Sequence, residues 1–182
     1  MDKIGVVCGR FQILHHEHMK YILAGKGKCE HLIIGITNFD ISEQIDCQVD
    51  PHRMQKESNP FSYWERYEMI KLAVLEAGLK QDEFDIVPCP IDNPSKIYNY
   101  VPKNANFYVT IYDKWGQEKM DRLNALGFKV ESLWTRSIEE KKIASTDIRR
   151  AIREGNDWEK YVPKSVYDYI KNNNLTDVVC GK

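Results

Sequence analysis

The sequence lacks the features that would place it among disulfide-rich or membrane-spanning proteins. No two cysteines form a C-x-x-C pair, and complete pairing would leave one thiol over, since the five lie at Cys8, Cys29, Cys47, Cys89 and Cys180. Free thiols in a reducing compartment are therefore expected. No segment approaches the apolar length that spans a bilayer, and Met1 to Cys8 has no basic region followed by a long apolar stretch. We expect a cytoplasmic protein with no membrane partner.

An excess of charge of one sign is also missing. The chain has 26 lysines and arginines against 27 aspartates and glutamates, a formal net charge of -1. No overall field therefore draws it to nucleic acid, and any site for an anion must be local. At 182 residues, with 42% hydrophobic and 29% charged residues, the composition predicts one globular domain over 1–182. Its expected parts are an α/β core at 1–135 and a helical C-terminal part at 136–182.

Strand-like and helix-like segments alternate along the chain. Short apolar runs predict strands at 3–8, 31–37, 84–89, 107–111 and 129–134. Helical spacing predicts helices at 16–26, 59–78, 114–126, 145–154 and 163–171. This alternation predicts an α/β fold, a Rossmann-like doubly wound parallel five-stranded sheet with a helical C-terminal segment. Ligands on such sheets bind beyond the C-terminal strand ends, and the irregular stretch 40–58 is expected to be a mobile connection or lid.

The segment after the first expected strand combines the features of an anion site. Gly9 allows a phosphate to approach the backbone, Arg10 offers a charged fork, and the next helix begins with free N–H groups and a positive dipole end. His15 and His18 are three residues apart, so in helical geometry they project from one face and can hydrogen-bond successive phosphate oxygens. The same histidines would also fit a solvated surface or, with poorer ligand spacing, a metal site.

A second candidate site lies at the helix expected over 145–154. Arg136 and two lysines precede Ser145 and Thr146, either of which suits an N-cap, and Arg149 lies one turn further on. Hydroxyls, amides and a guanidinium can together hold a polyphosphate. A capped surface helix with a charged face would show the same pattern. The presence of the histidine segment in the same chain is what favours a phosphate site.

These motifs together resemble the signatures of the nucleotidylyltransferase superfamily. Gly9-Arg10-Phe11-Gln12 with His15 and His18 resembles the H-x-G-H signature, in the form G-R-F-Q-P-x-H-x-G-H of archaeal-type nicotinamide mononucleotide adenylyltransferases. Ile143 to Arg149 resembles the second signature, I-S-S-T-x-I-R. The likeness covers nearly the whole chain, because two further segments resemble N-P-F-T-x-x-E-R and W-E-x-L-V-P: Asn59 to Arg66 and Trp158 to Pro163.

The resemblance implies an enzyme that transfers NMP from a nucleoside triphosphate to a small phosphate-bearing acceptor, by direct in-line attack with release of pyrophosphate. It implies that the catalytic residues are His15, His18 and Arg149. Nucleotide- and phosphate-binding roles are implied for Gly9, Arg10, Phe11, Gln12, Arg136, Ser145 and Thr146. Mg²⁺ is implied as a cofactor on the phosphates, with no ligand from protein side chains.

Three positions depart from the motifs of the superfamily. Ile13 stands where the family favours proline, and Ala144 replaces the first serine of the second signature. Glu17 replaces a glycine and places a negative charge beside the expected phosphate site, so it either points to solvent or alters acceptor or metal binding. None of these changes removes a histidine or the arginine on which the expected chemistry depends.

The acceptor site also departs from the family pattern. Relatives that use nicotinamide mononucleotide have S-G-N after the fourth strand, where this chain reads Tyr112-Asp113-Lys114-Trp115. Contacts with the acceptor are expected from Tyr98, Tyr112, Lys114 and Trp115, although packing on the sheet would explain any one of the aromatic residues.

Three functions remain open. With ATP favoured as donor, the first is a nicotinamide or nicotinate mononucleotide adenylyltransferase of NAD biosynthesis. The second is a CTP-dependent cytidylyltransferase that acts on a small phosphate or phosphonate. The third is a non-catalytic nucleotide-binding sensor, which the retained histidines and arginine disfavour. Relatives often self-associate, so a homo-oligomer is a further hypothesis.

Overall fold

The computed structural model describes residues 1–40, 55–140 and 142–181, and the chain divides into two compact units. Unit 1 comprises Met1–Arg10, Lys20–Phe39 and Lys80–Lys141. Unit 2 comprises Phe11–Met19, Asp40–Leu79 and Lys142–Lys182. Most of the expected lid at 40–58 lies outside the described residues. The single-domain organisation stays a prediction.

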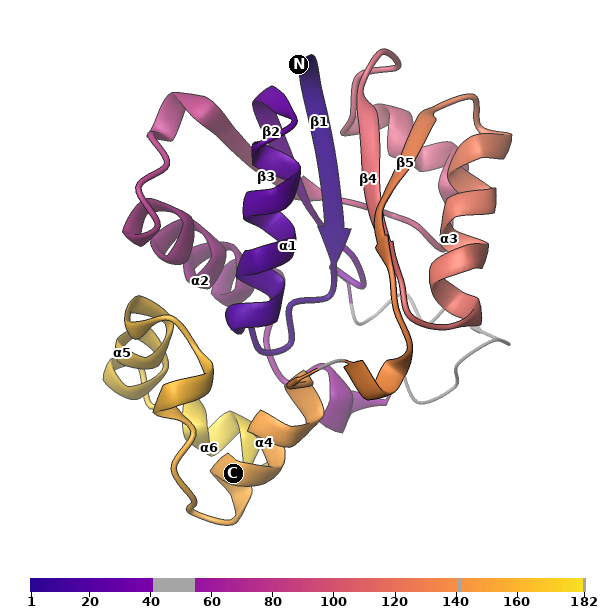
Figure 1. The fold of residues 1–182 in the computed structure, drawn as a ribbon. Coiled ribbons are helices and arrows are strands. Elements are labelled where there is room, and N and C mark those ends of the chain that lie inside the picture. The colour runs from indigo at the N-terminus through magenta and orange to yellow at the C-terminus, as the bar shows by residue number, and fades with distance from the viewer. Residues whose placement is uncertain (41–54, 141, 182) are drawn as a thin grey trace. The chain divides into compact units, whose positions relative to one another are not determined.

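Unit 1 contains a five-stranded parallel sheet in the order β3-β2-β1-β4-β5, visible in Figure 1. Its strands are β1 (Asp2–Gly9), β2 (Cys29–Ile36), β3 (Phe84–Pro88), β4 (Asn106–Ile111) and β5 (Lys129–Thr135). Each expected strand is present, with its ends displaced by at most two residues. The Rossmann-like doubly wound fold is confirmed, because β1 lies at the centre with the later strands added on both sides.

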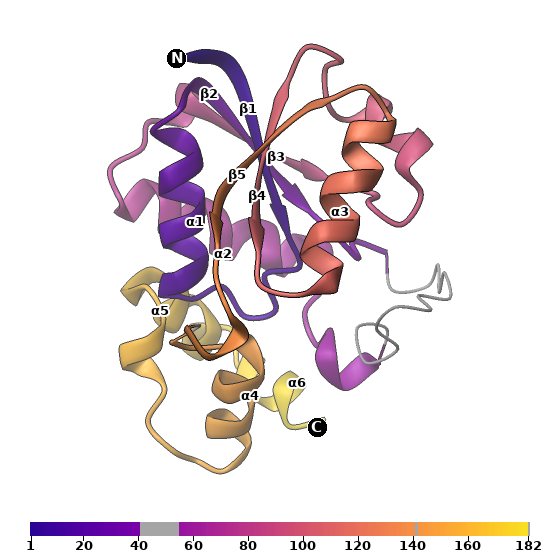
Figure 2. The ribbon, with the colours of Figure 1, turned by 45° about the vertical axis from the view of Figure 1, so that its right-hand side comes forward.

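Two helices cover opposite faces of this sheet. Gly25 of α1 (His16–Lys26) approaches Val7 and Tyr108, whereas Leu123 of α3 (Lys114–Ala125) packs in the cluster that contains Val6. Successive residues of a strand point to opposite faces, so the sheet lies between the two helices, as Figure 2 shows. The short 3₁₀ helices of unit 1 are η3 (Gln81–Glu83), η4 (Pro94–Asn99) and η5 (Ile138–Glu140).

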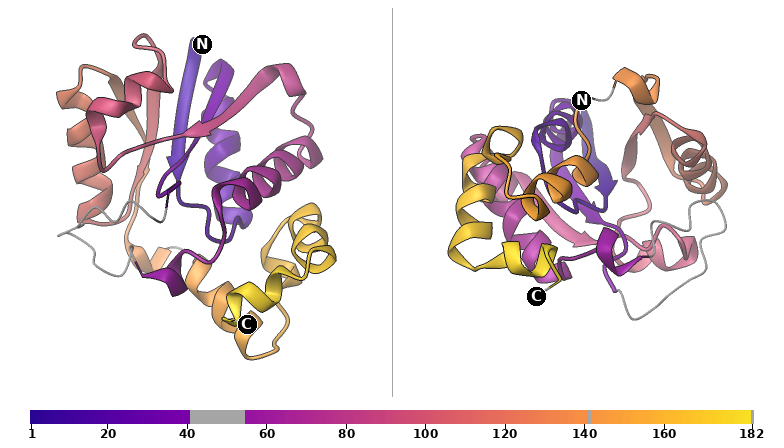
Figure 3. Two further views of the ribbon diagram at one scale, coloured as in Figure 1. Left: turned by 180° about the vertical axis from the view of Figure 1, so that it is seen from behind. Right: turned by 90° about the horizontal axis from the view of Figure 1, so that it is seen from below.

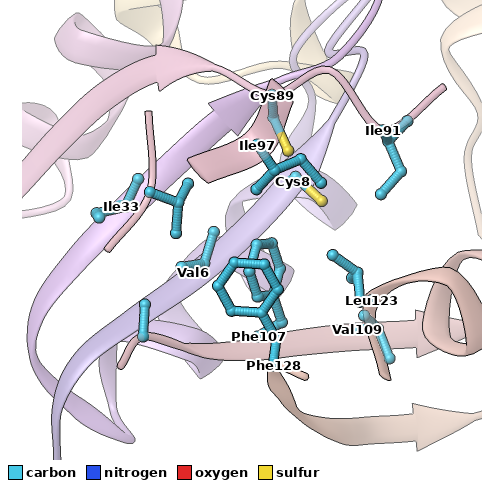
Figure 4. Close-up of a cluster of buried hydrophobic side chains, with 12 residues drawn as sticks. Val6, Cys8, Ile33, Cys89, Ile91, Ile97, Phe107, Val109, Leu123 and Phe128 are labelled. Atoms are coloured by element: carbon cyan, nitrogen blue, oxygen red, sulfur yellow. The ribbon is translucent and has the colours of Figure 1, made fainter. Parts of the chain in front are cut away.

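The core beneath α3 is apolar, and it includes two thiols. Phe107 and Phe128 meet edge to face, with 4.8 Å between ring centroids. Figure 4 shows Cys8 and Cys89 at one end of this cluster. Both are buried free thiols, as is Cys29 in unit 1, whereas Cys180 in unit 2 is a free thiol at an exposed position. Four of the five cysteines are thus free, in agreement with the prediction.

Unit 2 is helical over its described residues. Its helices are α2 (Tyr63–Glu76), α4 (Ser145–Arg153), α5 (Lys164–Asn172) and α6 (Leu175–Val179), with the first turns of α1 and the 3₁₀ helices η2 (Lys56–Ser58) and η6 (Glu159–Tyr161). In Figure 3, α5 and α6 lie beside α2 and α4. Ser165 N–H donates to the Glu76 carboxylate at 2.8 Å, which joins the start of α5 to the end of α2. Among the described residues no helix is long and apolar enough to cross a membrane.

One helix start and one helix cap differ from the sequence prediction. α2 begins at Tyr63 and not at Asn59-Pro60, because Ser62 and Glu65 form a reciprocal capping box. The N-cap of α4 is Ala144, so the expected capping role of Ser145 or Thr146 is wrong. The Asp147 carboxylate accepts the Ala144 N–H at 3.1 Å and caps α4 in their place, which leaves both hydroxyls for other contacts.

Close packing at Gly25 predicts a specific destabilisation. A Cβ at this position would lie 2.5 Å from Val7 Cγ1, so we expect Gly25→Ala to lower the free energy of unfolding by about 1 to 3 kcal/mol, as overpacked cores do. Gly27→Ala is the matched control, because its nearest atoms lie at 3.6 Å. Urea unfolding of both variants tests this, and equal stabilities would contradict the packing of α1 on the sheet.

Candidate phosphate-binding site

The segment that leads into α1 follows a backbone path fixed by buried side chains. Phe11 has a left-handed conformation with a φ of 53°, which costs a non-glycine residue about 1 to 2 kcal/mol. Its ring is 1% exposed and meets the His18 ring edge to face, with 5.1 Å between centroids. Burial of an aromatic ring offsets a cost of this size. Phe11 thereby fixes one side of His18.

His15 and His18 form a stacked pair at the start of α1. The helix begins at His16, as predicted, so His15 lies one residue before its first turn. Nδ1 of His15 accepts the His18 N–H at 3.4 Å, so this imidazole caps the first turn. The two rings are 3.7 Å apart and inclined by 18°. A ring whose Nδ1 accepts carries its proton on Nε2 when neutral, which makes Nε2 the donor toward an anion.

The start of α4 is tied to the same segment by two hydrogen bonds. Ser145 Oγ donates to the Ile13 carbonyl at 3.0 Å. Nη1 of Arg149 donates to the preceding carbonyl, that of Gln12, and its Nη2 donates to Thr146 Oγ1 at 3.2 Å. The two signature segments, far apart in the sequence, therefore meet within unit 2, as the phosphate-site hypothesis requires.

Gln12 joins a third segment, the approach to α2, to this arrangement. Its side-chain amide donates to the Phe61 carbonyl at 2.8 Å and accepts the Phe61 N–H at 3.0 Å. Both residues are buried, so a polar group of either one that lost its partner would destabilise the folded state. The side-chain amide of Gln12 therefore hydrogen-bonds the Phe61 backbone, while its backbone carbonyl accepts from Arg149.

Adjacent arginines of α4 have opposite electrostatic surroundings. Arg150 is exposed and pairs with the Asp147 carboxylate at 3.1 Å. Arg149 is 4% exposed, and among the described residues no carboxylate forms an ion pair with it. Burial, together with the nearby charge of Arg153, lowers the pKa of Arg149 to about 10. The guanidinium is still charged at neutral pH, so a buried positive charge lacks a counter-charge.

This set of groups suits a polyanion. A buried guanidinium without a carboxylate gains most from a ligand that supplies negative charge. The first turns of α1 and α4 contribute backbone N–H groups and positive dipole ends, and the stacked imidazoles add N–H donors. The arrangement can bind the phosphates of a nucleotide and stabilise charge on a leaving group.

Unit 2 contains a second buried arginine, Arg66, to which the sequence analysis assigned no role. Arg66, at the start of α2, is fully buried, and its Nε donates to the Ser62 carbonyl at 3.2 Å. The sequence signal for it was only the E-R pair of the N-P-F motif. Its burial could not be predicted, because an arginine on a helix is usually exposed.

The other predicted phosphate-binding residues belong to unit 1. Gly9 ends β1, and Arg10 follows it. Arg136 follows β5, and its guanidinium lies over the Trp134 ring at 5.2 Å from the centroid. Its backbone N–H donates to the Ile111 carbonyl at 2.9 Å.

The four predicted acceptor residues also lie in unit 1. The three aromatic ones each contact a different neighbouring side chain. Tyr98 stacks on Phe128 at 5.0 Å, and its hydroxyl donates to the Leu126 carbonyl. The Tyr112 hydroxyl accepts the Trp134 Nε1–H at 2.7 Å. Trp115 packs against Arg122, with 5.0 Å from guanidinium carbon to ring centroid. Lys114 is exposed at the first position of α3.

The described residues offer no ready-made metal site. Among them, no three His, Cys, Asp or Glu side chains are grouped so as to hold a metal. Glu17 is half-buried in the first turn of α1, where its charge suits the helix dipole. A hard cation such as Mg²⁺ is commonly held by substrate phosphates and water, and the polyanion site described above fits that arrangement.

Comparison with characterised proteins gives two groups of relatives. Phosphonoformate cytidylyltransferase from Streptomyces viridochromogenes is 42% identical over 167 residues, covering 92% of this chain and 90% of its own. Nicotinamide-nucleotide adenylyltransferase from Pyrococcus abyssi is 31% identical over 172 residues, covering 92% of this chain and 82% of its own.

A solved structure shares the fold of this chain, and a family model matches most of its sequence. A bifunctional NMN adenylyltransferase/ADP ribose pyrophosphatase from Francisella tularensis, complexed with AMP and a manganese ion, superposes with a TM-score of 0.67 at 18% identity. The match covers 98% of this chain and 52% of that one, so the chain spans about half the length of the bifunctional protein. The family model described as cytidylyltransferase-like matches residues 6–151. The chain therefore belongs to the cytidylyltransferase-like family and is a nucleotidyltransferase.

Proposed function

We propose that the protein is a cytidylyltransferase that transfers CMP from CTP to a small phosphonate or phosphate acid. The observation that carries the proposal is the 42% identity, over 92% of this chain, to phosphonoformate cytidylyltransferase. Identity to the nicotinamide-nucleotide adenylyltransferase of Pyrococcus abyssi is 31% over the same share of the chain. The sequence motifs placed the adenylyltransferase first and the cytidylyltransferase second. The identities reverse this order.

The acceptor segment supports the same choice. Where relatives that use nicotinamide mononucleotide carry S-G-N, the Asp113 carboxylate accepts the Gly116 N–H at 2.8 Å and caps α3. A capping carboxylate adds negative charge at this helix start, which is unfavourable for a phosphate bound there. Tyr98, one of the predicted acceptor residues, stacks on Phe128 and donates its hydroxyl hydrogen to the Leu126 carbonyl. An acceptor without a ring suits these contacts better than a nicotinamide nucleotide.

The proposed reaction is a direct displacement at the α-phosphorus of CTP. An oxygen of the acceptor phosphonate or phosphate attacks Pα, and the bond between Pα and the bridging oxygen of the β-phosphate breaks. Pyrophosphate leaves with the electron pair of that bond. Arg149 and the N–H groups at the start of α4 neutralise the leaving group, while His15 and His18 hold the α-phosphate in line. Mg²⁺, when bound, shields phosphate charge.

A nicotinamide or nicotinate mononucleotide adenylyltransferase is the second candidate. It is supported by the G-R-F-Q segment, the N-P-F segment at Asn59 and the 31% identity to the archaeal enzyme. A cytoplasmic location and self-association stay predictions for either function.

The proposed donor and acceptor can be tested by pyrophosphate release. With Mg²⁺ and each of the four nucleoside triphosphates, we expect release with CTP plus phosphonoformate or a similar small phosphonate. Release only with ATP plus nicotinamide mononucleotide would support the second candidate. Nucleotide binding without turnover for any acceptor would indicate a sensor and would contradict the proposal.

The stacked histidines predict a loss of activity that is separable from folding. His18→Ala should lower turnover by about 10² to 10³, the usual effect of removing a transition-state donor, with a much smaller effect on stability. His16→Ala is the matched control, because His16 is exposed on the same turn. Thermal melts beside the kinetics distinguish the effects: equal loss of folding and activity in His18→Ala would show that this residue is structural.

The missing counter-charge at Arg149 predicts stabilisation by anions. Pyrophosphate or CTP should raise the melting temperature of the wild-type protein, because a ligand that binds only the folded state stabilises it. Arg149→Met should abolish most of that rise, whereas Arg150→Met should keep it, since Arg150 already has a carboxylate partner. Equal ligand-induced shifts in both variants would exclude Arg149 from the phosphate site.

A further inference from the structure

The central strand β1 of unit 1 pairs with its neighbour β4 over only a short length. β1 pairs with β4 only at Gly5↔Asn106 and Val6↔Phe107, although it pairs with β2 along its full length. Beyond Val6 the Tyr21 hydroxyl bridges the two strands: it accepts the Cys8 N–H at 3.2 Å and donates to the Tyr108 carbonyl at 2.6 Å. The chain leaves β1 into α1 and β4 into α3, on opposite faces. This is the topological switch point of the sheet, where ligands of such folds bind.

A buried lysine reaches this switch point from α3. Lys119 is 9% exposed, and its Nζ donates to the Cys8 carbonyl, at the end of β1, at 3.4 Å. The same atom lies 6.0 Å from the centroid of the Tyr21 ring. These neighbours supply one long hydrogen bond and a π-face to an ammonium that has three donors. Lysine is almost never buried to this degree unless it is paired.

Carboxylates near Lys119 on α3 are committed elsewhere. Over the ranges that the structure describes, no carboxylate oxygen lies within ion-pair distance of Lys119. Its helical neighbour Glu118 pairs with Arg122, which also pairs with Asp92 at 3.4 Å. The protein therefore keeps a desolvated positive charge at the switch point without a carboxylate to balance it, an arrangement that costs stability unless a ligand anion completes it.

Among the described residues, the thiols of Cys8 and Cys89 are the internal groups near enough to feel the charge of Lys119 and so to compete for this role. A hydrogen bond from Cys89, together with the charge of Lys119, lowers the pKa of Cys8. The thiols lie in the apolar cluster beneath α3 (Figure 4). A thiolate would share the Lys119 charge without any substrate, so the experiment below includes a Cys8 variant.

We propose that Lys119 binds an anionic group of the acceptor, the phosphonate, phosphate or carboxylate of a small acid, at the switch point between β1 and β4. This inference rests on the proposed function and deepens it. The residues predicted to hold the triphosphate, at the starts of α1 and α4, belong to unit 2, whereas Lys119 belongs to the helix that follows the acceptor segment. Lys114, the acceptor lysine predicted from sequence, is exposed, so its ammonium is already solvated and gains less from a bound anion.

The test compares Michaelis constants for the two substrates. Lys119→Met should raise KM for phosphonoformate by about 10- to 100-fold, as expected for a lost hydrogen bond to a charged group, and leave KM for CTP within about twofold. Lys119→Arg, which keeps the charge, should recover part of the loss. Lys103→Met, which neutralises an exposed lysine of unit 1, and Cys8→Ala, which keeps the backbone carbonyl, should leave both constants near the wild-type values.

Each other outcome overturns the proposal. An unchanged acceptor KM in Lys119→Met, or equal changes for acceptor and CTP, would show that Lys119 does not bind the acceptor. An equal effect of Cys8→Ala would show that the ammonium serves the thiol. If Lys119→Met does not fold, Lys119→Arg and Lys119→Gln decide the question by the same comparison of KM values.

Failure of the proposed function gives a different result. If the wild-type protein turns over no pair of substrates, the function is wrong, and binding is then measured alone. A rise in melting temperature with phosphonoformate in the wild type and in Lys103→Met, lost in Lys119→Met, would still assign Lys119 to an oxyanion site. The same rise in all three proteins would remove that assignment too.

Discussion

The site in unit 2 depends on the hydrogen bond from the Arg149 guanidinium to the Gln12 carbonyl. This bond, with that from Ser145 to the Ile13 carbonyl, holds the start of α4 against the segment that precedes His15. The side-chain amide of Gln12 extends the connection to Phe61 at the approach to α2. Three segments far apart in sequence are therefore held by a few directional contacts. Because all of them are buried or half-buried, loss of one leaves polar groups without partners.

The same contacts explain why a stable fold can retain an unfavourable charge. Arg149 binds neutral oxygens, while Asp147, the nearest acid on its helix, is used by Arg150 and by the cap of α4. A carboxylate partner would stabilise the free protein, but it would also compete with the phosphates of a nucleotide. Lys119 in unit 1 repeats this pattern at the end of β1. Over its described residues, each unit thus contains a buried cation that no carboxylate balances, and the cost is compatible with the usual exchange of stability for function.

Much of the fold was predictable, because short apolar runs that alternate with helical patterns along the chain favour a parallel sheet. The meeting of the two signature segments was also predicted, since both carried anion-binding residue types at helix starts. Other features depended on tertiary contacts. Sequence alone could not distinguish Ser145 from a helix cap, because its role depends on the hydrogen bond from its hydroxyl to the distant Ile13 carbonyl. Helical periodicity likewise gave no reason to expect that Arg66 or Lys119 is buried. The capping role of His15 was missed because an imidazole is an unusual N-cap.

The central claim is that the starts of α1 and α4 bind one polyphosphate. The most direct measurement is a crystal structure with Mg²⁺ and a non-hydrolysable analogue of CTP. The account predicts that the imidazole of His18 and the guanidinium of Arg149 both lie within hydrogen-bonding distance of oxygens of the same triphosphate. A triphosphate bound elsewhere, with Arg149 still bonded only to Gln12 and Thr146, would contradict it.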